Sequence, residues 1–310
     1  NKGSRFANVK AFEPVAQSAG GAASATGWNE GSANIPTQSA AALGDSNSGM
    51  HLTIAILAAL LQREHPGKGS YVYQSMQDAV INLCRIKLRD QLMLDNLGAL
   101  PFYAVYPNYK WGKAIPRSEN SEGGQVIGWT YKAKGWETDP NAYVYIVIQN
   151  KNKSWETIAN TMGHPEWATD ERFKDWEHRQ LHKQEIYPLI ESYTKNYDKY
   201  ELTKKLGEAG ILVGPVLDWH ELENDPDLNE DGTLVKINQG GNRGEFKTVG
   251  MPFTMSNYKP TYKRAPDLGE NNKEILSSLG YDSEQIEELV KGVISKVEKP
   301  HNPRTKVIKD

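Results

Sequence analysis

The chain changes character near residue 45. Residues 1–45 are dominated by small side chains, whereas apolar residues recur from Met50 to Leu61 until His65-Pro66-Gly67 interrupts the pattern. Small residues let backbones pack or bend tightly, and an apolar run that stops at a Pro-Gly turn is typical of a helix. We therefore expect a long apolar helix that begins at about Ser46 and follows a closely packed N-terminal segment.

A second helix should follow after a short strand. Ser70 to Met76 is rich in β-branched and aromatic residues, which favours a strand, and Gln77 to Leu94 has a helical pattern. The order helix, strand, helix indicates an α/β unit.

A smaller lobe is expected to begin beyond this unit. Residues 97–150 are rich in Gly, Pro, Trp and Tyr and end in a predicted strand, Ala142 to Ile148, and another apolar run spans Ile211 to Leu217. Further helices are predicted over residues 155–162, 183–200, 272–279 and 283–294, and residues 299–310 are predicted to be a solvated tail.

Composition narrows the class of protein. At 310 residues the chain has room for two lobes. Its net charge of -3 argues against a general nucleic-acid binder. The single cysteine, Cys84, allows no disulfide within the chain, which favours a reducing compartment. The sequence has neither an apolar run of about 18 residues nor the layout of a signal peptide, so we expect a soluble cytoplasmic protein without membrane contact.

Asp45 is the first candidate for chemistry. It follows flexible, small residues and opens the predicted helix, where free N–H groups and the helix dipole favour an ionised carboxylate. Such a carboxylate is a usable nucleophile. On spacing alone, the simpler interpretation is that Asp45 or Ser46 is only the N-cap of the helix.

Two other clusters are weaker candidates. Gly123 and Gly124, in Ser121-Glu122-Gly123-Gly124-Gln125, would let backbone amides approach an anion or fold over a ligand, but a plain turn explains them as well. Lys10 and Phe12 would share one face of a strand, as an adenine and phosphate site requires, although a surface lysine beside a core Phe is commoner.

The histidines give little indication of a catalytic or metal-binding role. His51, one turn into the predicted helix, is a candidate base, but a packed or half-exposed histidine is the commoner case. With one cysteine and no ligand-like spacing of histidines, no zinc pattern exists, and we predict no metal.

Three stretches closely resemble class III CoA-transferases: Val15 to Ala23, Ala42 to His51, and Met76 to Gln91. The resemblance continues through much of the remaining chain, at residues 134–143, 163–167, 248–250 and 265–270. Members carry a substantial N-terminal part before the equivalent of Lys10, with a Rossmann-like start and much of the CoA pocket. We therefore expect this chain to be a fragment whose N-terminal segment is missing.

The resemblance implies roles for particular residues. It makes Asp45 the nucleophile and Glu122 to Gln125 a mobile glycine loop, in which Gly123 and Gly124 take part in catalysis and bind substrate together with Gln125. The implied CoA contacts are Val9, Lys10, Ala11, Phe12 and Met76.

Two departures from the family affect these roles. Phe12 stands where the family often has Tyr, which removes a hydroxyl donor, and the loop has two glycines where the family has four, which makes it stiffer.

The implied fold is α/β: a Rossmann-like large lobe with a smaller α+β lobe, in a homodimer of interlocked rings. Residues 1–90 would be the part of the large lobe with the nucleophile, 91–110 a linker and 111–195 the small lobe with the glycine loop. Residues 196–300 would return to the large lobe, and 301–310 would be a tail.

The implied activity moves CoA between formyl-CoA and oxalate through aspartyl anhydrides and an aspartyl-CoA thioester. Coenzyme A would be part of the substrate, with no tightly bound cofactor. Three alternatives stay open: acetyl-CoA as the donor for oxalate, another acyl-CoA enzyme of the same fold such as a racemase or lyase, and a non-catalytic chain that binds acyl-CoA.

Overall fold

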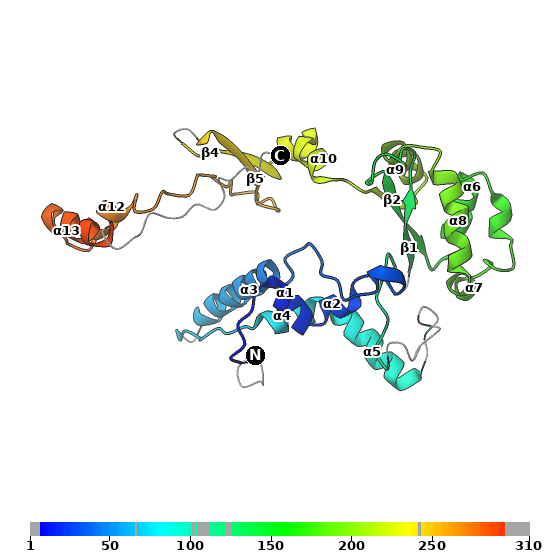
Figure 1. Ribbon diagram of the computed structural model, residues 1–310, viewed down its shortest axis with the longest axis horizontal. Helices are drawn as coiled ribbons and strands as arrows, with labels where there is room; N and C mark the ends of the chain where they lie inside the picture. Colours follow the sequence, from blue (N-terminus) through cyan, green and yellow to red (C-terminus); the bar gives the residue numbers. More distant parts are fainter. Residues whose placement is uncertain are drawn as a thin grey trace. The chain divides into compact units, whose positions relative to one another are not determined.

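The structure, a computed structural model, describes most of the chain (Figure 1). The described residues are 7–65, 67–98, 100, 103, 112–121, 126–240 and 243–294. The chain divides into two compact units, residues 1–216 and 217–310. Helices and strands both occur in each unit, which confirms a mixed α/β architecture. No helix in the described residues is long and apolar enough to cross a membrane.

The first unit begins with a group of helices that pack through small residues. Ala16, Ala22 and Val80 form a buried cluster, and a Cβ on Gly20 would lie only 2.5 Å from the Val80 side chain. Close contact of this kind is what the small residues of the sequence permit. The helices are α1 (Glu13–Ala19), α2 (Ala22–Ala25), α3 (Asp45–Arg63), α4 (Met76–Leu83) and α5 (Arg85–Leu97).

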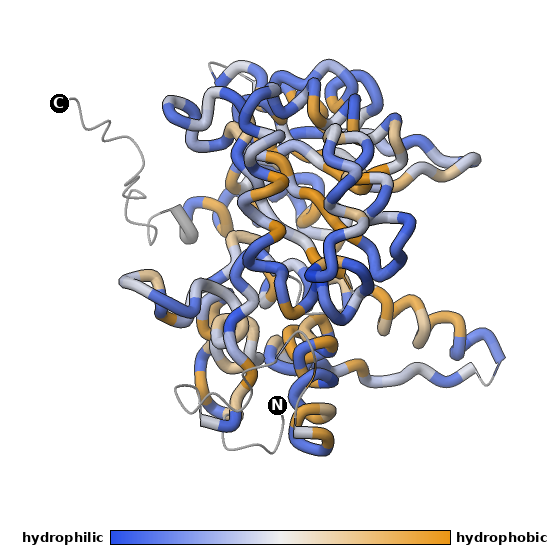
Figure 2. Tube along the Cα trace, turned by 90° about the vertical axis from the view of Figure 1, so that its right-hand side faces the viewer, coloured by the Kyte–Doolittle hydropathy of each residue, from blue (hydrophilic) through white to orange (hydrophobic). Residues whose placement is uncertain are grey.

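Helix α3 is the apolar helix expected from the sequence, and it begins one residue earlier than predicted. Its most exposed apolar side chains are Met50, Ile54, Leu57 and Leu61, each at least 60% exposed. Their 4-3-4 spacing places them on one helical face. Figure 2 shows α3 as a mostly orange helix that ends in blue. We call these four residues the bare stripe of α3.

The strand predicted over Ser70 to Met76 is wrong. Residues 67–75 adopt no regular structure, and Met76 opens α4, whose first turn is capped by the Ser75 hydroxyl accepting from the Asp78 N–H at 3.1 Å. Residues 9–12 are not a strand either. Strands need a hydrogen-bonded neighbour, and no other strand exists among the described residues of 7–98. The helix predicted over 77–94 is divided at Cys84 into α4 and α5.

A three-stranded antiparallel sheet forms the centre of the remaining part of this unit. Its strands are β1 (Val126–Lys132), β2 (Tyr143–Gln149) and β3 (Leu212–Pro215), in that spatial order. The strand predicted over Ala142 to Ile148 is confirmed as β2, within one residue at either end.

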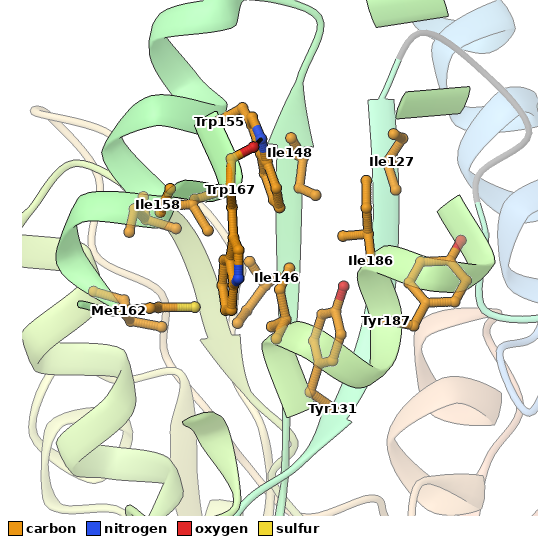
Figure 3. Packing of buried hydrophobic residues seen from close by; sticks show 14 of the residues in the cluster. Ile127, Tyr131, Ile146, Ile148, Trp155, Ile158, Met162, Trp167, Ile186 and Tyr187 are labelled. Atoms are coloured by element: carbon orange, nitrogen blue, oxygen red, sulfur yellow. Dashed lines mark hydrogen bonds between the residues drawn. The ribbon is translucent and has the colours of Figure 1, made fainter. Parts of the chain in front are cut away.

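Helices cover this sheet and complete its core. Ile146 and Ile148 of β2 pack with Trp155 and Ile158, and the Trp155 indole N–H donates to the Trp167 carbonyl at 2.9 Å (Figure 3). The covering helices are α6 (Asn152–Thr161), α7 (Trp176–Leu181), α8 (Lys183–Thr194) and α9 (Lys199–Glu208), with the short turn η3 (Pro165–Ala168). The buried side chains of this sheet and its helices are called the sheet core below.

The second unit contains a two-stranded antiparallel ribbon and four helices among its described residues. The ribbon pairs β4 (Leu234–Asn238) with β5 (Glu245–Val249). The helices are α10 (Trp219–Asn224), α11 (Pro226–Glu230), α12 (Asn272–Ser278) and α13 (Ser283–Ile294). The last two confirm the helices predicted over 272–279 and 283–294. The Rossmann-like lobe, the lobe boundaries and the interlocked dimer stay predictions.

Candidate active site

Asp45 is the first residue of α3, and its side chain does not cap the helix. The N-cap position belongs to Gly44, and no side chain of α3 itself makes a capping bond. Asp45 is exposed, and within the described part of the chain its carboxylate has no hydrogen-bond or ion-pair partner. The interpretation of Asp45 as a plain N-cap is therefore wrong.

The cap comes instead from Glu13, which opens α1. One Glu13 carboxylate oxygen accepts from the Gly44 N–H at 2.8 Å, and the other accepts from the Asp45 N–H at 2.5 Å. Burial alone would raise the pKa of Glu13, but bonds from the backbone of Asp45, Gly44 and Leu43 and from Gln17 outweigh it and lower the pKa. An ionised carboxylate from another helix thus neutralises the positive end of α3.

Two residues of α1 hold this arrangement in place. A Cβ on Gly44 would lie 2.7 Å from the Ala16 Cβ, so only glycine allows α3 to begin this close to α1. The buried Gln17 side chain donates to Glu13 at 2.8 Å and to the Ala41 carbonyl at 3.2 Å, and it accepts from the Ser39 N–H at 2.9 Å. The segment that leads into Asp45 is therefore fixed along one face of α1.

His51 serves as a contact between helices. Its Nδ1 lies 2.9 Å from the Asn47 carbonyl, and its Nε2 lies 3.3 Å from the Asn82 side-chain oxygen. The buried Asn47 amide donates to the Ala79 carbonyl of α4 at 3.0 Å. Both ring nitrogens of His51 are engaged, which supports the packed role over that of a base.

A cavity of about 520 Å³ lies beside α1, within the usual range for a small-molecule site. Val9, Ala11 and Met76 line it, which brings together three of the five predicted CoA contacts. Ala16 also lines it and lies against the Gly44 position, so the cavity and the start of α3 share one helix.

The other two predicted CoA contacts are not on this cavity. Lys10 and Phe12 are both exposed, Phe12 at 78%. The Phe12 carbonyl accepts from the Ala16 N–H at 3.0 Å, so Phe12 begins α1 through its backbone.

The predicted glycine loop, Glu122 to Gln125, lies outside the described residues, so the roles of Gly123, Gly124 and Gln125 stay predictions. The residues that precede it are well fixed. The Tyr145 hydroxyl donates to the Asn120 carbonyl at 2.9 Å, and the Asn29 side chain donates to Glu119 at 3.0 Å. Glu119 has a φ of 52°, which is uncommon for a residue other than glycine.

Sequence reasoning did not identify Glu13 and Gln17 as site residues. The spacing of three residues could have identified them. Glu13, Ala16 and Gln17 are spaced i, i+3 and i+4, which puts a carboxylate, a small residue and an amide on one face of a short helix. In the described part of the chain, no three His, Cys, Asp or Glu side chains come together as a metal site requires.

Comparison with known proteins gives three kinds of match. The family model described as CoA-transferase family III matches residues 2–272. Two curated relatives, both named formyl-CoA:oxalate CoA-transferase, come from Shigella sonnei strain Ss046 and Escherichia coli O139:H28 strain E24377A. Each is 50% identical over 283 residues, which is 91% of this chain and 67% of the relative.

Solved structures match at lower identity. The Mycobacterium tuberculosis protein Rv3272 aligns with a TM-score of 0.65 at 18% identity, and a CAIB/BAIF family protein from Brucella suis with 0.65 at 22%. They cover 87% and 89% of this chain. The chain spans 65% of each of these solved chains. These likenesses show the fold.

Proposed function

Because the chain belongs to CoA-transferase family III, we propose that it takes part in CoA transfer with Asp45 as the residue that carries the acyl group. The observation that carries this proposal is the Asp45 carboxylate. It is exposed at the start of α3 and has no partner among the described residues, while Glu13 accepts from the N–H groups of Gly44 and Asp45 and so supplies the cap from another helix.

The proposed reaction starts with attack of the Asp45 carboxylate on the acyl-CoA carbonyl. A mixed anhydride forms, and the C–S bond breaks to release CoA thiolate. The thiolate then attacks the aspartyl carbonyl, which gives an aspartyl-CoA thioester and releases the acyl group as a carboxylate.

The acceptor acid reverses these two steps. Its carboxylate attacks the aspartyl thioester to form a new anhydride and release the thiolate. The thiolate attacks the acceptor's carbonyl to give the new acyl-CoA, and Asp45 returns to its ionised form. No external oxidant or proton donor is consumed.

We propose formyl-CoA and oxalate as the substrate pair, with formate and oxalyl-CoA as products. The support is the name of the curated relatives at 50% identity. The cavity lined by Val9, Ala11 and Met76 is the proposed contact for the CoA part, and Gly123 and Gly124 are proposed to exclude water from the intermediates.

Trapping the intermediate tests the proposal. The chain is incubated with formyl-CoA, treated with hydroxylamine or borohydride, and digested for peptide mass mapping. We expect modification at Asp45 only when acyl-CoA is present, and none in Asp45→Asn. An unmodified Asp45 peptide in the wild-type chain overturns the proposal.

Donor and acceptor assays separate the alternatives. Formyl-CoA and acetyl-CoA are each tested with oxalate, and oxalyl-CoA is measured. Turnover with acetyl-CoA alone would replace the proposed donor, and conversion of an acyl-CoA without any acceptor would indicate a racemase or lyase. Saturable binding of acyl-CoA without turnover or adduct would indicate a non-catalytic chain.

We also propose a homodimer, supported by the bare stripe of α3. Apolar side chains exposed along one helical face are typical of a helix that another element covers. Light scattering of the wild-type chain and of Leu57→Lys tests this. A dimer that the substitution dissociates is expected, whereas a wild-type monomer contradicts the proposal.

A further inference from the structure

Glu13 is unusual in this site because it is a second carboxylate, hydrogen-bonded to the backbone of Asp45, the residue proposed to react. Its two oxygens accept from the N–H groups of Gly44 and Asp45, at 2.8 and 2.5 Å. Two anionic side chains near one helix start would normally repel, unless one of them has a fixed set of donors. Glu13 has such a set, completed by the Gln17 amide at 2.8 Å.

Asp45 has an alternative role as the cap of its own helix, in which its carboxylate would accept from the N–H group of Asn47 or Ser48. In the structure these two N–H groups donate to the carbonyls of Ala42 and Gly44, at 3.2 and 3.3 Å, while Glu13 holds the N–H groups just before them and fixes where α3 begins. Asp is among the residues most favoured at an N-cap, and a helix start that lacks an acceptor shifts readily by one residue. If α3 began one residue later, Asp45 would become its cap and its carboxylate would be bound to backbone N–H groups. A carboxylate held in that way is a poorer nucleophile, because attack must first break those bonds.

We propose that Glu13 is a positioning residue for Asp45: by capping α3 from α1, it keeps the Asp45 carboxylate free of its own helix. This inference rests on the proposed function of Asp45. Two contacts fix the position of Glu13 relative to α3. Gly44 packs against Ala16 without room for a Cβ, and the Gln17 side chain bonds to the backbone of Ser39 and Ala41. Glu13 therefore has little freedom to turn away from the N–H groups.

The first test is Glu13→Ala, assayed with the complete chain. We expect kcat to fall at least about tenfold, which corresponds to a rise of about 1.4 kcal/mol in the activation free energy. KM for the acyl-CoA should change less than about twofold, because Glu13 does not line the cavity beside α1. An unchanged kcat, or a loss confined to KM, overturns the proposal.

Asp198→Ala is the matched control. Asp198 caps α9 by accepting from the N–H groups of Tyr200 and Glu201, both at 2.9 Å, so its removal also opens two N–H groups at a helix start. We expect a similar fall in melting temperature without a change in kcat. An equal fall in kcat in both variants would mean that the loss in Glu13→Ala comes from general destabilisation, and it would overturn the proposal.

Glu13→Gln separates positioning from plain helix stabilisation. The amide keeps the length of the side chain but has one acceptor oxygen, and its N–H₂ group faces the second backbone donor. We expect it to restore most of the melting temperature while kcat stays low. Full recovery of kcat together with the melting temperature would contradict the proposal.

A chemical probe makes the inference independent of turnover. A water-soluble carbodiimide with an amine labels accessible carboxylates, and peptide mass mapping gives the rate at Asp45. We expect the rate to fall several-fold in Glu13→Ala and to stay at the wild-type value in Asp198→Ala. If the chain is inactive but Asp45 is labelled more slowly in Glu13→Ala than in wild type, the proposed function fails and the positioning role stands. If Asp45 is labelled at the same rate in wild type, Glu13→Ala and Asp198→Ala, the positioning role fails.

Discussion

The sheet core and helix α3 belong to the same unit but use their apolar residues in opposite ways. Leu202 of α9 is fully buried in the sheet core, whereas Leu61 of α3 is 71% exposed. The first region buries its side chains within the chain and so stabilises itself. The second keeps its apolar stripe bare and carries the exposed Asp45 at its start. Most of the buried apolar side chains therefore lie in one region and the carboxylate proposed to react lies in the other.

The largest expected effect is on activity. Asp45→Asn should lower the rate of CoA transfer at least about 10³-fold, because the nucleophilic carboxylate is lost. The melting temperature should stay within a few degrees, since the side chain is exposed and no described residue bonds to it. Steady-state kinetics and thermal denaturation measure the two quantities. A large fall in melting temperature would mean that Asp45 also supports the fold.

A matched pair of leucines tests the comparison directly. Leu202→Ala should lower the free energy of unfolding by about 2–5 kcal/mol, because it leaves a cavity in the sheet core. Leu61→Ala should change it by less than about 0.5 kcal/mol in the monomer. Urea denaturation at low protein concentration measures both. Equal losses would show that α3 is covered even in the monomer.

A smaller effect is expected inside the sheet core. The Tyr131 side chain is fully buried, and its hydroxyl has no hydrogen-bond partner in the described residues, which costs free energy. Tyr131→Phe should therefore raise the free energy of unfolding by up to about 1 kcal/mol. Denaturant unfolding checks the sign, and a loss of stability would reveal a partner for the hydroxyl.

The smallest expected effect depends on pH. Because the pKa of Glu13 is lowered from its ordinary value of 4.5, the stability that Glu13 adds is complete above that value. It is lost as the pH falls through the lowered pKa, where the carboxyl becomes protonated in the folded chain. The stability difference between wild type and Glu13→Ala should therefore shrink in acid, while that for Leu202→Ala should not. Unfolding curves across this range test it, and a difference that persists in acid would contradict an ionised cap.

Local patterns predicted α3 and β2 well because their causes are local, whereas the helix predicted over 183–200 ends at Thr194 and a separate helix begins at Lys199. The apolar run with its Pro-Gly stop gave α3 to within a residue at its start, and alternating Tyr, Val and Ile residues gave β2. The same β-branched and aromatic signal failed at Tyr71 to Tyr73. Strand formation depends on a neighbouring strand, which a short sequence window does not contain.

The candidate site was predicted in part. Asp45 could be identified from its position before an apolar helix and from the family resemblance, but its cap could not. Glu13 lies 32 residues away, and its contact with Asp45 requires α1 and α3 to pack first. The division at Cys84 had no glycine or proline to mark it, so two helices were predicted as one.

The absence of a side chain at Gly44 has a practical consequence for reading related chains. The gap between α1 and the start of α3 has no room for a Cβ, although the φ of -81° at Gly44 suits any residue. A substitution there would not strain the backbone, but its side chain would push the start of α3 away from α1. Homologues or variants can therefore be chosen for assay by asking whether a glycine precedes the aspartate. A chain with a bulkier residue at the position of Gly44 keeps the equivalent of Asp45, but α3 can no longer begin this close to α1.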